Sequence, residues 1–252
     1  MTAALALQLR NVDQRFGATT IIQGLSLDIP CGQRHAIIGP NGAGKSTLFN
    51  LVSGRFAPTR GSIRLNGEEI AGLRPFAINR RGLARSFQLT NIFPRLSVLE
   101  NLRCSVFWSL GYRYCFWRNA DKLRDARERA LSTLEEIGLS SRRDVPAGVL
   151  TYAEQRALEI GITIAGGARV ILLDEPTSGM SRDEADQAVA LIRRISEGRT
   201  LVIVEHDMSV VFGLADQISV LVYGKILATD TPAHIRDNPA VQAAYLGTVP
   251  DA

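Results

Sequence analysis

A glycine-rich stretch has the residue types and spacing of a loop that binds nucleotide phosphates. Residues 39–46 fit the pattern G-x-x-x-x-G-K-[ST] at every position, and the apolar run 35–38 leads directly into them. The glycines let successive backbone N–H groups turn toward phosphate oxygens, and a helix expected over 46–52 would add its positive end. The sequence therefore predicts a site for ATP and Mg²⁺. The expected contacts are Gly39, Pro40, Asn41, Gly42, Ala43, Gly44, Lys45, Ser46 and Thr47.

Within this loop, three side chains have distinct expected roles. Lys45 would neutralise the β- and γ-phosphates, and the Ser46 hydroxyl would be a ligand of Mg²⁺. Thr47 would donate to the α-phosphate. A chance glycine-rich turn is the competing interpretation, and the flanking strand and helix patterns argue against it.

Two acidic residues follow a continuous apolar run, 170–173. Asp174 is expected to hold Mg²⁺ and its water shell, and Glu175 to orient or deprotonate the attacking water. A plain turn before a helix is the alternative, because Pro176 comes next. His206 ends the next apolar run, 201–204, and its position predicts a contact with the γ-phosphate. These residues together predict ATP hydrolysis.

The strands and helices that must position these residues are predicted to form an α/β fold. Residues 5–9, 21–29 and 62–65 have strand patterns, which predict an antiparallel β part near the N-terminus. Later apolar runs alternate with helical stretches at 182–196 and 210–215, which is typical of a parallel sheet covered on both faces. A hairpin is expected over 218–227.

The middle of the chain is expected to be helical, from about residue 98 to 137. Over 121–137, apolar residues fall on one side of a helix; they are Leu123, Ala126, Ala130, Leu134 and Ile137. Six of the sixteen aromatic residues lie close together before this helix. They form either the core of a small helical subdomain or a contact with another protein; they are Phe107, Trp108, Tyr112, Tyr114, Phe116 and Trp117.

Composition and charge narrow the class of protein. The 252 residues carry a formal net charge of +4 without a concentrated basic stripe, which argues against a nucleic-acid partner. The three cysteines show no CxxC spacing, so we expect reduced, buried or half-buried thiols. Neither a signal peptide nor a long apolar run is visible, so the sequence predicts a cytoplasmic protein that reaches any membrane through a partner.

In order and spacing, these motifs resemble the nucleotide-binding subunit of ABC transporters over essentially the whole chain. The resemblance implies a P-loop NTPase core of 1–88 and 155–252, with an inserted helical subdomain of 89–154, in a single domain. It implies that Phe16 stacks on adenine, although a core residue at a strand edge is the alternative. It also implies that Gln88 contacts Mg²⁺, takes part in catalysis and shifts with the membrane partner.

Finer features resemble the branched-chain amino-acid importer type, in segments 82–88, 92–102 and 231–247. Proteins of that type energise uptake of branched-chain amino acids, amides, urea or small aromatic acids. The resemblance implies a second ATPase subunit, identical or different, transmembrane permease subunits, and an extracytoplasmic solute-binding protein. It places the chain at the cytoplasmic face of the inner membrane. A lipopolysaccharide-export ATPase, a soluble non-transport ABC ATPase and a non-hydrolysing regulatory module are the alternatives.

One motif departs from the family pattern. The usual Leu-Ser-Gly-Gly-Gln signature is replaced here by residues 150–154, in which Thr151, Tyr152 and Ala153 are expected to bind the nucleotide held by the partner chain. Threonine keeps the hydroxyl, but alanine in place of glycine is tolerated only where its backbone is helical. In a heterodimer, we expect the site that uses this signature to hydrolyse ATP more slowly than the other.

Overall fold

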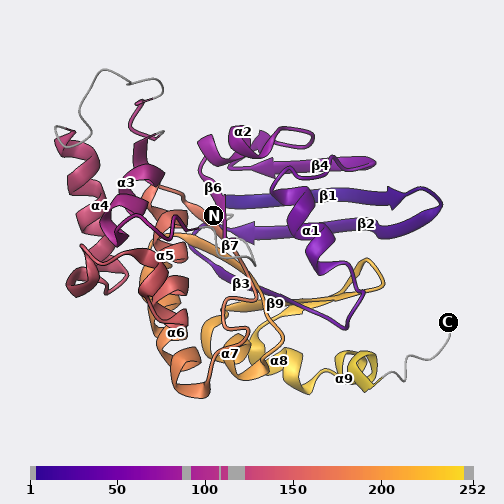
Figure 1. The fold of residues 1–252 in the computed structure, drawn as a ribbon. Coiled ribbons are helices and arrows are strands. Elements are labelled where there is room, and N and C mark those ends of the chain that lie inside the picture. The colour runs from indigo at the N-terminus through magenta and orange to yellow at the C-terminus, as the bar shows by residue number, and fades with distance from the viewer. Residues whose placement is uncertain (1–3, 87–91, 108, 113–122, 247–252) are drawn as a thin grey trace.

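Two sheets with helices on their faces make up the fold in the computed structural model, which describes residues 4–86, 92–107, 109–112 and 123–246 (Figure 1). The first sheet is antiparallel, with strand order β2-β1-β4-β5. Its strands are β1 (Leu5–Phe16), β2 (Thr19–Pro30), β4 (Arg60–Leu65) and β5 (Glu68–Glu69). The predicted antiparallel β part near the N-terminus is therefore confirmed.

The second sheet carries the parallel strands and has the order β10-β9-β3-β8-β7-β6. Neighbouring strands run parallel except for β9 and β10, which form the expected hairpin. Its strands are β3 (Arg34–Ile38), β6 (Leu83–Arg85), β7 (Val170–Asp174), β8 (Thr200–Val204), β9 (Gln217–Val222) and β10 (Lys225–Asp230). The fold is thus the predicted α/β type with a parallel sheet.

Helices connect these strands and cover the second sheet. They are α1 (Lys45–Val52), α2 (Pro75–Arg80), α3 (Val98–Phe107), α4 (Arg124–Glu136), α5 (Tyr152–Ala165), α6 (Arg182–Ile195), α7 (Met208–Leu214), α8 (Pro232–Asp237) and α9 (Pro239–Leu246). Short 3-10 helices occur at Ser140–Arg142 and Ala147–Val149. Among the described residues, no helix is both long enough and apolar enough to cross a bilayer.

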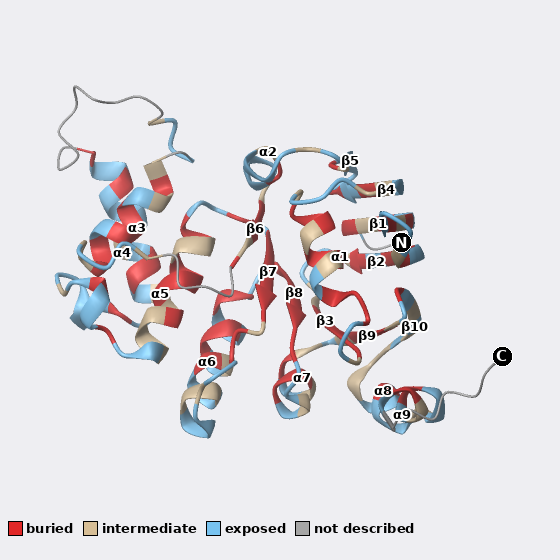
Figure 2. Cartoon of the chain, turned by 45° about the vertical axis from the view of Figure 1, so that its right-hand side comes forward, coloured by how far each residue is buried: buried red, intermediate tan, exposed pale blue. Residues whose placement is uncertain are grey.

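The central strands β3, β7 and β8 of the second sheet are buried on both faces, because apolar clusters lie on either side of them (Figure 2). On one face, Leu172 and Val204 pack with helix α1 and the antiparallel sheet. On the other face, Leu173 and Ile203 pack in the cluster that includes the helical middle of the chain. Every residue of β7 and β8 is buried, as the continuous apolar runs predict.

The helical part is built by α3, α4 and α5, which lie together to one side of the parallel sheet in Figure 1. The apolar positions predicted to line one side of the helix over 121–137 are all buried in the same cluster. Helix α5 packs against α3 and α4, and it also packs against α6 and β6. The expected boundary after residue 154 falls inside α5, whose helix begins two residues earlier.

The cysteines differ from the expectation of buried or half-buried thiols. Cys31 lies just after β2 and Cys104 lies on α3, and both are free and exposed. A small residue on the solvent side of an amphipathic helix leaves the apolar pattern intact, so the sequence pattern carries no signal of its exposure. Cys115 lies outside the described residues, as do Trp108, Tyr114, Phe116 and Trp117 of the aromatic group.

A buried histidine on β3 should make stability depend on pH. His35 is 1% exposed, and its ring nitrogens contact Ser219 Oγ at 2.8 Å and Gln33 Oε1 at 3.1 Å. Burial lowers the pKa of His35 to about 4, from an ordinary value of 6.5. The unfolded chain therefore binds a proton that the native chain excludes, and stability falls as pH decreases from about 6.5 to about 4.

We expect this loss to be about 3 kcal/mol between pH 7 and pH 4, measured as the free energy of unfolding by urea titration. His35→Gln, which has no titratable ring, should show a correspondingly smaller pH dependence over this window. An equal pH dependence in the two proteins would show that His35 is not the group responsible.

Candidate active site

The phosphate-binding loop joins the end of β3 to the start of α1, as the sequence predicts. Gly44 precedes α1 with a φ of 106°, and a Cβ there would lie 2.8 Å from Ile22 Cδ1. At Gly39, a Cβ would collide with the carbonyl oxygen of Leu221. Both positions therefore require glycine, and the loop is held close to its neighbours.

The hairpin turn between β9 and β10 supports this loop from behind. The N–H of Gly224 donates to the Ala43 carbonyl at 3.0 Å, and the N–H of Gln23 on β2 donates to the Gly224 carbonyl at 3.0 Å. These bonds connect the loop to both sheets. Such support restrains the backbone of the loop, whose N–H groups are the expected donors to phosphate oxygens.

Lys45 lies in the first turn of α1 and reaches back over the loop. Its Nζ donates to the carbonyl oxygens of Gly39 at 2.6 Å and Pro40 at 3.1 Å. Burial lowers the pKa of Lys45, while the nearby carboxylates of Glu175 and Asp174 act in the opposite direction. The ammonium is thus held directly over the loop, between it and the two acidic residues.

Glu175 and His206 lie together at the same cavity. Glu175 Oε1 is 2.8 Å from His206 Nε2. Residues 41–47 of the loop, Ile21, Glu175 and His206 line a cavity of about 350 Å³. The tertiary structure therefore brings together the phosphate loop and the two side chains predicted to act on water and the γ-phosphate.

The backbone of Glu175 is in an unusual conformation. Its φ is 47°, in the left-handed region that residues with a Cβ seldom adopt. The Glu175 N–H donates to the Val204 carbonyl at 2.8 Å, which ties the end of β7 to the end of β8. A residue held in such a conformation must be fixed by its surroundings, and this is common at functional sites.

Arg156 of α5 supplies part of that support. Its guanidinium donates to the carbonyl oxygens of Asp174 at 3.2 Å, Glu175 at 3.4 Å and Pro176 at 3.2 Å. The same group forms an ion pair with Glu159 at 2.8 Å, and both side chains are nearly buried. One arginine therefore connects the signature helix to the backbone that carries the catalytic candidates.

Asp174 lies at the end of β7 and is 1% exposed. Its Oδ2 accepts from Arg85 NH2 at 2.8 Å. Its Oδ1 is buried and has no hydrogen-bond partner among the residues that the structure describes. A buried carboxylate oxygen of this kind is a suitable acceptor for a metal-bound water.

The signature residues lie apart from this cavity. Thr151 caps α5: its hydroxyl accepts from the Glu154 N–H at 3.2 Å, and the Glu154 carboxylate accepts from the Thr151 N–H at 2.9 Å. Tyr152 is 51% exposed, and its hydroxyl donates to the Ser178 carbonyl at 3.0 Å. Ala153 lies in the first turn of α5, so the helical backbone that a tolerated alanine requires is present.

The residue predicted to stack on adenine does not line this cavity. Phe16 ends β1, is 44% exposed and packs edge-on against Phe56, with ring centroids 5.2 Å apart. It is thus available on a surface rather than part of the core. Gln88 lies outside the described residues.

Three further residues at this site, Arg85, Arg156 and Glu205, were not predicted from the sequence. Glu205 is 4% exposed, and it accepts from the Thr177 N–H at 2.9 Å and from the His206 N–H at 3.0 Å. A charged residue immediately before a functional histidine and directly after a buried strand is the signal that could have identified Glu205.

Comparisons with known proteins agree with this geometry. The family model described as ABC transporter matches residues 22–178, and that described as branched-chain amino acid ATP-binding cassette transporter matches 225–251. The high-affinity branched-chain amino acid transport ATP-binding protein BraF of Pseudomonas aeruginosa is 38% identical over 250 residues, covering 96% of this chain and 97% of that protein. The corresponding Escherichia coli protein, LivG, is 35% identical over 251 residues, covering 96% and 97%.

Solved structures of two ATP-binding cassettes of ABC transporters are also similar. One is an ADP conformation, with a TM-score of 0.84 and 27% identity, covering 96% of this chain and 99% of that one. The other is nucleotide-free, with a TM-score of 0.81 and 27% identity, covering 96% and 98%. With the phosphate loop, the Asp-Glu pair and the histidine in one place, these similarities show that the chain belongs to the ABC transporter family, as an ATP-hydrolysing subunit.

Proposed function

We propose that this chain hydrolyses Mg²⁺-ATP to energise import of branched-chain amino acids through a membrane assembly. The observation that carries the proposal is the shared cavity, in which Lys45, Glu175 and His206 meet at the phosphate loop. The substrate class rests on the relatives, which are branched-chain amino acid transport proteins matched over nearly their whole length. The match of the C-terminal residues 225–251 to a branched-chain amino acid family model supports the same class.

The residues at the loop fit Mg²⁺. This ion prefers oxygen ligands, retains several waters and is commonly held by one or two carboxylates together with substrate phosphates. Two oxygen atoms can serve as such ligands. They are the Ser46 hydroxyl and the buried Oδ1 of Asp174, which has no hydrogen-bond partner among the described residues. Ser46, Asp174 and Gln88 would hold the ion, which would neutralise charge on the β- and γ-phosphates.

In the proposed reaction, each side chain has one task. The ammonium of Lys45 exchanges its contacts with the loop carbonyls for phosphate oxygens and neutralises them. The Glu175 carboxylate orients the attacking water and accepts its proton. His206 contacts Glu175 at 2.8 Å in the ligand-free site, and with ATP bound its N–H would donate to the γ-phosphate. Phe16 stacks on the adenine ring.

We further propose that each catalytic site is completed by a second ATPase subunit. The N-terminal end of the 14-residue helix α5 presents backbone N–H groups and the Thr151 hydroxyl, which suit an anionic phosphate. Since the signature residues lie outside the cavity of their own chain, Thr151, Tyr152 and Ala153 would contact the nucleotide of the partner. The Tyr152–Ser178 bond then connects this contact to the loop that follows Glu175.

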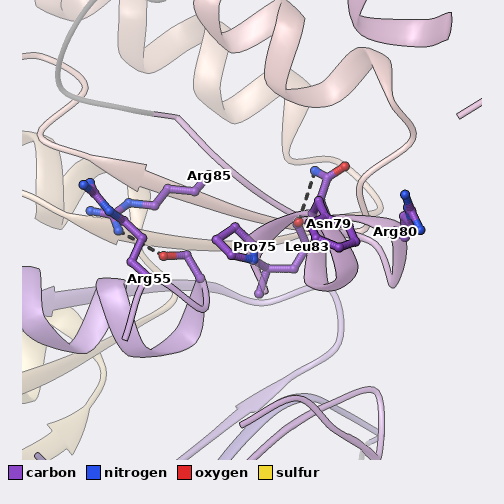
Figure 3. Close-up of a pocket in the computed structure, with 8 residues that line it drawn as sticks. Arg55, Pro75, Asn79, Arg80, Leu83 and Arg85 are labelled. Atoms are coloured by element: carbon purple, nitrogen blue, oxygen red, sulfur yellow. Dashed lines mark hydrogen bonds between the residues drawn. The ribbon is translucent and has the colours of Figure 1, made fainter. Parts of the chain in front are cut away.

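A groove beside the end of α1 is the proposed binding site for a cytoplasmic helix of the permease (Figure 3). It has a volume of about 740 Å³ and is lined by Pro75, Phe76 and Leu83 together with Arg55, Arg80 and Arg85. Apolar walls with arginines at their edges favour an amphipathic helix that carries acidic side chains. This contact would place the chain at the cytoplasmic face of the membrane.

Transport by the reconstituted assembly tests the proposal. The chain would be purified with its permease subunits and its solute-binding protein and placed in ATP-loaded vesicles. We expect ATP-dependent uptake of labelled leucine, isoleucine or valine, and no uptake when the vesicles contain ADP. ATP-dependent uptake of an amide, urea or an aromatic acid alone would overturn the substrate class. Outward transport would favour the export-type alternative.

A further inference from the structure

Arg85 connects three parts of the fold at the end of β6. Its side chain is 9% exposed. NH2 donates to Asp174 Oδ2 at 2.8 Å, and NH1 donates to Asn50 Oδ1 at 2.7 Å and to Ser53 Oγ at 3.1 Å. A single buried guanidinium therefore joins the end of β7 to the end of helix α1.

The two elements joined by Arg85 each supply a proposed oxygen donor for Mg²⁺. Ser46 lies in the first turn of α1, and Asp174 is the last residue of β7. Their relative position depends on how α1 packs against the sheet. The arginine fork has a fixed planar geometry, so its bonds to Asp174 and Asn50 restrain that packing in a way that a point charge would not.

The two oxygens of Asp174 are in different surroundings because of this contact. Oδ2 is held by Arg85, whereas Oδ1 is buried without a partner among the described residues. A residue that hydrogen-bonds to a metal-binding carboxylate, without touching the metal, orients that carboxylate. We infer that Arg85 is a positioning residue, which fixes Asp174 and helix α1 so that Oδ1 faces the magnesium site.

Arg85 also lines the groove of Figure 3. A permease helix bound there would therefore touch the same side chain that holds Asp174. This inference rests on the proposed metal role of Asp174, so its test must separate the two.

The test compares the affinity of the purified chain for a non-hydrolysable ATP analogue with Mg²⁺ and with EDTA. In Arg85→Met, the gain in affinity that Mg²⁺ provides should fall by about tenfold, while the affinity in EDTA stays unchanged. Arg85→Lys keeps the charge but lacks the planar fork whose two arms reach Asn50 and Asp174, so its loss should be intermediate. Arg199→Met removes a part-buried pair with Glu136 at a distant place and serves as the matched control.

Asp174→Asn and the double variant Arg85→Met/Asp174→Asn complete the design. If Arg85 acts through Asp174, the double variant loses no more than Asp174→Asn alone, because the two effects are not additive. The inference would be overturned if the losses of affinity in the two single variants add in the double variant. It would also be overturned if Arg85→Met lost the same affinity with Mg²⁺ as with EDTA. Should Arg85→Met fail to fold, a wild-type response in Arg85→Lys would overturn it too. An unaffected Asp174→Asn would instead overturn the metal role itself, and the inference with it.

Discussion

Glu175→Gln should lower the turnover of ATP hydrolysis by about a hundredfold or more, while the variant still binds ATP. Glutamine has nearly the shape of glutamate and can keep the contact with His206, but it cannot accept a proton from water. The defect should therefore appear in the rate constant and not in nucleotide affinity. Phosphate release at saturating ATP and nucleotide titration measure the two quantities separately.

If two ATPase subunits enclose the nucleotide, as proposed, the stalled variant should also accumulate as an ATP-bound dimer. Size-exclusion chromatography with ATP would detect that species, which the wild-type chain consumes by hydrolysis. Glu197→Gln, an exposed glutamate after α6, is the matched control and should hydrolyse ATP normally. Turnover at the wild-type rate in Glu175→Gln would show that another group activates the water.

Arg156→Met should destabilise the fold by about 3–5 kcal/mol, measured as the free energy of unfolding in urea. The substitution removes the 2.8 Å ion pair with Glu159 in a site where both side chains are less than a tenth exposed. An exposed pair gives the control: Arg34→Met, which breaks the contact with Asp216, should cost about 1 kcal/mol or less.

The double variant Arg156→Met/Glu159→Met separates stability from catalysis. Removing both charges should restore part of the lost stability, because two apolar side chains then replace the buried ion pair. Turnover should remain low, since the carbonyls of Asp174, Glu175 and Pro176 have lost the donor that supports the left-handed backbone of Glu175. Recovery of both properties would show that Arg156 does not position the catalytic backbone.

Local chemistry let the sequence predict much of this site. Positions 39–46 carry a complete phosphate-loop pattern, and the apolar runs before Asp174 and His206 indicate adjacent parallel strands. Residues at the ends of such strands converge on one edge of a sheet, so the closeness of Glu175 and His206 follows from the pattern. The 2.8 Å contact between them confirms that these two side chains meet.

Other features depended on contacts between distant parts of the chain. Arg85 bonds Asp174 from 89 positions away, and no periodicity marks that pairing. The boundary of the helical part, expected after residue 154, stays a prediction, because α5 packs against α3 and α4 and also against α6 and β6. The exposure of Cys31 and Cys104 was likewise not predicted, because the burial of a small residue depends on which distant part of the chain packs against it.

By itself, the sequence determined the α/β elements and the phosphate loop, and it predicted which residues hydrolyse ATP. These features depend on side-chain chemistry and on the spacing of apolar residues over short stretches, and both can be seen in a single sequence. Only the tertiary structure decided how the acidic residues are held. Arg85 orients Asp174 and Arg156 supports the backbone of Glu175, because buried charges require partners, and those partners come from whichever elements pack nearby.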